Sequence, residues 1–130
     1  MVKRKLINIM FIIPMLISNT FGNDLNTNIN ICKAGIATVM SQSPKIIKFS
    51  NKVNDALYLF YTRPSDKQKF IYKCKIQGNN IIWGTYKGRW RTSVYDSKLS
   101  FKIQKNIITV KDKYDDGSET VKTFNLKQLK

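Results

Sequence analysis

Residues 70–85 read FIYKCKIQGNNIIWGT and predict a β-hairpin. In the first half, one set of alternating positions is apolar: Phe70, Tyr72, Cys74 and Ile76. The positions between them include two lysines, so this segment is typical of a half-buried strand. Gly78-Asn79 forms a two-residue turn, and residues 80–85 supply the partner strand.

Similar segments continue on both sides of this hairpin. Further strands are predicted over residues 45–50, 56–62, 98–104, 107–112 and 119–126, with turns at 63–67, 105–106 and 115–118. Successive hairpins at even spacing favour an antiparallel meander or a small barrel of about 6–7 strands. The pattern leaves open whether the sheet closes, because closure depends on strand register.

One short helix precedes the strands. Residues 31–42 place Cys32, Ile36, Val39 and Met40 at helical spacing. Pro44 ends the helix. The polar residues 23–30 are expected to be a flexible N-terminal stretch. The predicted fold class is therefore mainly β (α+β), with one N-terminal helix.

Gly88-Arg89-Trp90 resembles the short G-x-W pattern of lipocalin-like barrels. In that family the tryptophan closes one end of the barrel, so the resemblance implies a small lipocalin-like barrel, open or closed. The motif opens the first strand of a lipocalin, whereas here it falls in the middle of the chain. The resemblance covers three residues and implies no binding site.

The first 22 residues are typical of a cleaved secretion signal. A basic start is followed by twelve residues, Leu6 to Ile17, that are too few to span a bilayer comfortably. Thr20 and Gly22 suit cleavage after Gly22, and cleavage after Thr20 is the near alternative. Residues 31–130 then form one domain, which is expected in the bacterial periplasm or outside the cell.

The remaining chain has two cysteines, Cys32 and Cys74. An even count in an exported protein favours a structural disulfide. The alternatives are a reactive thiol or half of a metal site. No CxxC spacing and no histidine is present to complete a ligand set, so neither a metal nor a cofactor is expected.

The charge is strongly positive, with 23 Lys+Arg against 8 Asp+Glu and a formal net charge of +15. Three basic residues lie in the predicted leader, so the chain after it carries +12. Without histidine, neither Ser-His-Asp nor Cys-His catalysis can be assembled. The expected function is therefore non-catalytic binding, with a small hydrolase as a remote alternative.

The first candidate contact surface combines aromatic and arginine residues: Tyr86, Arg89, Trp90, Arg91 and Tyr95. Arginine beside aromatic side chains is the composition of protein-binding hot spots. We therefore expect a protein partner in the cell envelope. In the alternative interpretation, Trp83 and Trp90 fill the core and the arginines stack on them. We favour the core for Trp83, and the position of Trp90 is left open.

The second candidate is a lysine-rich sheet face made of Lys73, Lys75, Lys102, Lys111, Lys113 and Lys122. Outward lysines on neighbouring strands would form one positive surface for anionic envelope polymer, either lipopolysaccharide or acidic glycan. The alternative is a solvated face that prevents aggregation. Export disfavours nucleic acid as the partner.

Overall fold

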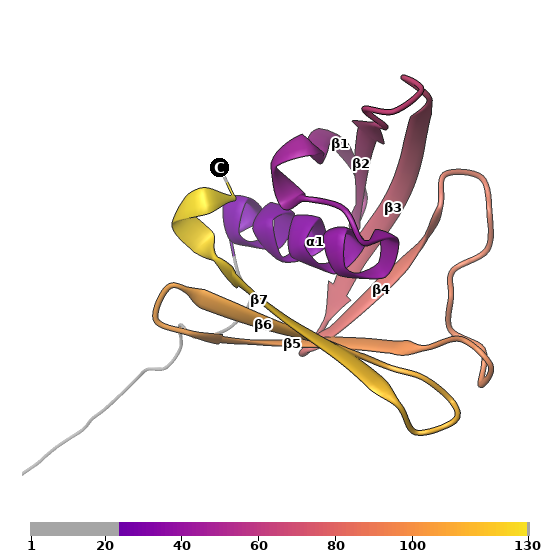
Figure 1. Ribbon diagram of the computed structural model, residues 1–130, viewed down its shortest axis with the longest axis vertical. Helices are drawn as coiled ribbons and strands as arrows, with labels where there is room; N and C mark the ends of the chain where they lie inside the picture. The colour runs from indigo at the N-terminus through magenta and orange to yellow at the C-terminus, as the bar shows by residue number, and fades with distance from the viewer. Residues whose placement is uncertain (1–23, 130) are drawn as a thin grey trace, which may run out of the picture.

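One helix and seven strands make up the computed structural model, which describes residues 24–129 (Figure 1). The elements are α1 (Leu25–Met40), β1 (Lys48–Val53), β2 (Ala56–Thr62), β3 (Lys69–Gln77), β4 (Asn80–Thr85), β5 (Lys98–Gln104), β6 (Ile107–Lys113) and β7 (Glu119–Asn125), with 3₁₀ turns η2 (Pro44–Ile46) and η3 (Leu126–Gln128). The predicted signal peptide lies outside the described residues.

The strands form an antiparallel meander, as the hairpin pattern predicts. The strand order is β1-β2-β3-β4-β5-β6-β7, so each strand pairs only with its neighbours in sequence. Because β1 and β7 lie at opposite ends of this order, the sheet stays open and does not form a closed barrel. The G-x-W residues lie in the connection between β4 and β5 and open no strand.

The sheet divides at the junction of β4 and β5. These strands pair at only two positions, Asn80 with Ser100 and Ile81 with Leu99, and then diverge. Figure 1 shows β1–β4 and β5–β7 as two limbs that cross at an angle, with α1 packed between them. We call the face toward α1 the inner face and the opposite face the outer face.

The helix α1 begins six residues before the predicted start. The side chain of Asp24 accepts a hydrogen bond of 2.8 Å from the Thr27 backbone N–H, which caps the first turn. Residues 25–30, expected to be flexible, are therefore helical. Ser41 ends the helix in a left-handed conformation, with φ of 53°. The spacing of apolar residues identified the buried part of the helix. Its first turns are polar and contain no such spacing, so the predicted start was too late.

The core lies between the helix and the inner face. Cys32 of α1 and Cys74 of β3 form the predicted disulfide, and both are fully buried. Gly35 lets the helix approach the junction of β4 and β5, because a Cβ atom there would lie 3.1 Å from the Ile81 side chain. Trp83 is 8% exposed, which confirms its predicted place in the core.

Candidate functional site

The connection between β4 and β5, residues 86–97, folds back over the outer face, and we call it the outer loop. Its backbone is fixed to the sheet, since the Arg91 N–H donates to the Trp83 carbonyl at 2.8 Å. The Lys73 ammonium donates to the Gly88 carbonyl at 2.7 Å. Gly84 leaves the required space, because a Cβ atom on it would come within 2.5 Å of the Arg89 carbonyl oxygen.

Trp90 lies half-buried in the outer loop, close to two lysines of β3. The ammonium nitrogens of Lys73 and Lys75 lie 4.6 and 4.4 Å from its ring centroid. These distances are within the range of cation–π attraction. Trp90 therefore holds the loop against β3. It is neither a core residue nor a free contact residue, the two interpretations that the sequence left open.

Asp96 joins the two arginines of the outer loop. Its carboxylate accepts hydrogen bonds from Arg89 at 2.6 and 3.0 Å and from the Ser93 N–H at 3.0 Å, and it lies 3.5 Å from Arg91. The hydrogen bond from Arg89 is the main reason that the pKa of Asp96 lies well below its usual range. Both arginines are thus engaged within the chain.

The tip of the outer loop carries two exposed apolar side chains. Val94 is 74% exposed and Tyr95 is 83% exposed. Of the five predicted contact residues, Tyr95 is the one that projects freely from this tip. The sequence analysis did not identify Val94 or Asp96. An aspartate in the same short loop as two arginines does, however, indicate internal ion pairs.

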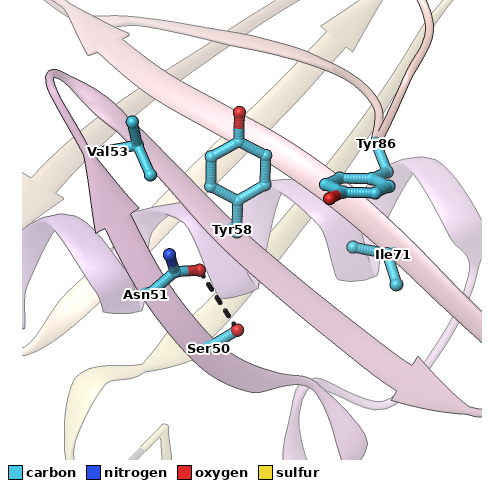
Figure 2. Close-up of a pocket in the computed structure, with 6 residues that line it drawn as sticks. All are labelled: Ser50, Asn51, Val53, Tyr58, Ile71 and Tyr86. Atoms are coloured by element: carbon cyan, nitrogen blue, oxygen red, sulfur yellow. Dashed lines mark hydrogen bonds between the residues drawn. The ribbon is translucent and has the colours of Figure 1, made fainter.

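Tyr86 belongs to a different site, a hollow of about 270 Å³ on the outer face (Figure 2). Its ring meets the ring of Tyr58 edge to face, with centroids 5.8 Å apart. The hollow is lined by Ser50, Asn51, Val53, Tyr58, Ile71 and Tyr86. The sequence pattern could not reveal it, because its walls come from three strands and the outer loop.

Five of the six predicted lysines share the outer face. Along β3, β5 and β6 they alternate with the buried residues of the inner face, so their side chains lie on the other side of the sheet. They are Lys73, Lys75, Lys102, Lys111 and Lys113. Lys98 joins them and lies directly opposite Lys113 in the β5–β6 pairing. We call the surface formed by these six residues the lysine face.

The placement of Lys122 on this face is wrong. It pairs with Val110, which is fully buried under α1, so the two residues share the inner side of the sheet. Lys122 itself is exposed because β7 is the edge strand. A shift of one residue in register reverses every side chain of a strand, and the polar β7 sequence contains no apolar alternation that would have set the register.

The acidic residues form no metal-binding cluster within residues 24–129. No group of three His, Cys, Asp or Glu residues suited to a metal is found there. Asp112 is 3% exposed on the inner side of β6, and its Oδ1 has no hydrogen-bond partner. Asp116 accepts hydrogen bonds from Ser118 in the β6–β7 turn, as turn chemistry predicts.

Over the same residues, no helix has the length and apolar character needed to cross a membrane. No protein-family model, curated protein or solved structure matches the chain.

Proposed function

We propose that this chain is an exported, non-catalytic binding protein that contacts a protein partner through the tip of the outer loop. The observation that carries the proposal is that the tip is exposed while the loop backbone beneath it is held by hydrogen bonds. Val94 and Tyr95 are 74% and 83% exposed, while the loop beneath them is held by Asp96, Arg89 and the β4 backbone. An apolar tip on an ordered base suits a contact surface.

Order in the free protein favours affinity. Binding normally costs the entropy of immobilising loop side chains and backbone, and a preorganised loop avoids part of that cost. Tyrosine supplies a large amphipathic contact area with few rotatable bonds. The outer loop therefore presents Tyr95 as an anchor, with Arg89 and Arg91 serving as internal supports.

The proposed compartment is the periplasm or the exterior of the cell. The buried disulfide supports this, because disulfides persist in oxidising compartments and are rare in the reducing cytosol. The leader-like N-terminus is the second support. The proposed partner is accordingly a secreted protein or a protein of the cell envelope.

Photo-crosslinking in the producing cells tests this proposal. A photoreactive phenylalanine at position 95 is expected to give one discrete adduct, and the same residue at position 107 is expected to give none. Ile107 is a suitable control, since it is exposed and lies at the opposite end of the β5–β6 pair from Lys98, where the outer loop ends. The adduct should disappear in a Val94→Ser background. Equal adducts from both positions, or none from position 95, would contradict the proposal.

A second candidate function is adhesion to anionic envelope polymer through the lysine face. Lys98 and Lys113 lie directly opposite each other on neighbouring strands. Like charges in this position are destabilising, and a polyanion would relieve the repulsion. The K98Q/K113Q variant should therefore bind lipopolysaccharide more weakly and with a shallower salt dependence. Lys122→Gln, on the other face, is the control for loss of a lysine charge.

A further inference from the structure

The hollow beside Tyr86 owes its shape to a β-bulge in β1. The register changes from Phe49 opposite Leu59 to Asn51 opposite Tyr58, which leaves Ser50 as the extra residue. Without the bulge, Asn51 would lie opposite Leu57 and face the core side of the sheet. The bulge instead brings the polar side chains of Ser50 and Asn51 together at the hollow (Figure 2).

The polar groups of the hollow are oriented. The Ser50 hydroxyl donates to the Asn51 amide oxygen at 3.2 Å. The amide nitrogen of Asn51 therefore points the other way, as Figure 2 shows, and keeps its two N–H donors. A hydroxylated ligand in the hollow would meet a donor pair at one wall.

The opposite walls are aromatic and accessible. Tyr86 is 48% exposed and stands nearly perpendicular to Tyr58, with an angle of 82° between the two ring planes. A phenol ring offers a flat apolar face together with a hydroxyl group. The volume of about 270 Å³ lies just below the range of about 300–1,000 Å³ typical of small-molecule sites, which suits a single ring.

Positive charge lies beside the hollow. A second, shallower depression of about 350 Å³ shares Ile71 and Tyr86 with it and is lined by Lys69 and Lys87. The Lys69 ammonium lies 4.4 Å from the Phe60 ring centroid, and the Lys87 ammonium lies 5.9 Å from that of Tyr86. An occupant of the hollow that carries a negative group on the adjoining unit would be held by these ammonium groups.

We propose that this hollow binds one pyranose ring of an acidic glycan. The C–H face of the sugar packs on Tyr86 and Tyr58, its hydroxyls accept from the Asn51 amide, and a carboxylate or sulfate of the neighbouring unit meets Lys69 and Lys87. Two aromatic faces, an oriented amide and flanking cations match the three chemical features of such a ligand. The site is separate from the tip of the outer loop and does not rest on the proposed function.

Titration calorimetry of the oxidised, exported protein tests the site with oligogalacturonides as the acidic probe and malto-oligosaccharides of equal length as the neutral probe. We expect saturable binding of the acidic probe at physiological salt and at least tenfold weaker binding of the neutral one. Tyr86→Ala and Asn51→Ala should each weaken acidic-probe binding about tenfold or more, while Tyr86→Phe should retain most of it. Tyr114→Ala is the control and should bind as the parent protein does.

Three results would overturn the proposal: no saturable binding of the acidic probe, equal binding of both probes, or equal losses in Tyr86→Ala and Tyr114→Ala. Val94→Ser separates this site from the proposed function. It should bind the oligosaccharide normally although it abolishes the adduct formed from position 95. If both probes bind equally and an apolar peptide displaces them, the hollow is a protein contact instead.

Discussion

Asp96 organises the outer loop through a small number of charged contacts. Its side chain is 10% exposed, whereas the partner side chains Arg89 and Arg91 are 58% and 41% exposed. A carboxylate that accepts several hydrogen bonds from cations and backbone N–H groups is stabilised in its charged form. The two arginines next to Trp90 are therefore structural supports of the loop more than free anchors.

The titration of Asp96 tests this role. Its pKa is lowered, chiefly by the hydrogen bond from Arg89, so its contribution to stability is present above the ordinary aspartate value of about 3.9 and is lost as the pH falls through the lower folded value. In a carboxyl ¹³C NMR titration we expect the Asp96 inflection well below that ordinary value. The amide shifts of Ser93 and Tyr95 should move in the same step.

The Asp96→Asn variant is the complementary measurement for the loop. Loss of the charge should raise backbone mobility over residues 93–96, seen as lower NMR order parameters, while the strands stay unchanged. An Asp96 inflection at the ordinary value, or an unchanged loop in Asp96→Asn, would show that other contacts hold the loop.

Gly84 is the second single residue on which the outer loop depends. The Gly84→Ala variant should lower the free energy of unfolding by about 1–3 kcal/mol, because the new methyl group meets the Arg89 carbonyl, a rigid backbone atom. Urea unfolding measures this loss. Ser100→Ala is the control: Ser100 lies in β5 on the same face of the sheet as Gly84, and its replacement should change the free energy of unfolding little. If Gly84→Ala is equally harmless, the loop can shift without cost.

The disulfide joins two elements, α1 and β3, that are far apart in sequence. It closes a loop with a sequence separation of 42 residues, for which the chain-entropy model gives about 4 kcal/mol. The C32A/C74A variant should lose a free energy of this order in urea unfolding. Both positions are fully buried, so alanine avoids placing a hydroxyl in the core.

Hydrogen exchange locates the effect of the disulfide. Protection should fall first in α1, because the helix is held by packing and by this link, whereas β3 remains paired on both sides. Intact mass of the exported protein provides the direct control. Two free thiols there would contradict a native disulfide, and uniform loss of protection would contradict its role as an anchor of the helix.

The outer face of the molecule carries the six positive charges of the lysine face, on β3, β5 and β6. Since Lys98 and Lys113 oppose each other directly, the K98Q/K113Q variant should be more stable than the parent protein by a few tenths of a kcal/mol at low salt. The gain should vanish as salt screens the repulsion. Thermal unfolding at two ionic strengths measures it. Lys122→Gln, with no lysine opposite, should show no such gain.

Much of the architecture follows from local patterning. The alternation in residues 70–76 corresponds to β3, and the turns at 78–79 and 105–106 correspond to the β3–β4 and β5–β6 hairpins. Pairing between neighbours in sequence needs only local signals, which is why the meander was predictable. The helix start and the register of β7 were not, because both lie in polar segments where apolar periodicity is absent.

The candidate sites show the same division. Residue types alone identified Tyr86, Trp90 and Tyr95 as notable, and they indicated the disulfide. The separation of Tyr86 from Tyr95, the use of Arg89 and Arg91 by Asp96, and the hollow at the β1 bulge depend on contacts between elements. Composition and alternation act along the chain and select strands, turns and charge. The direction in which a loop folds, and whether a sheet closes, depend on register and packing across the chain, which local patterns do not encode.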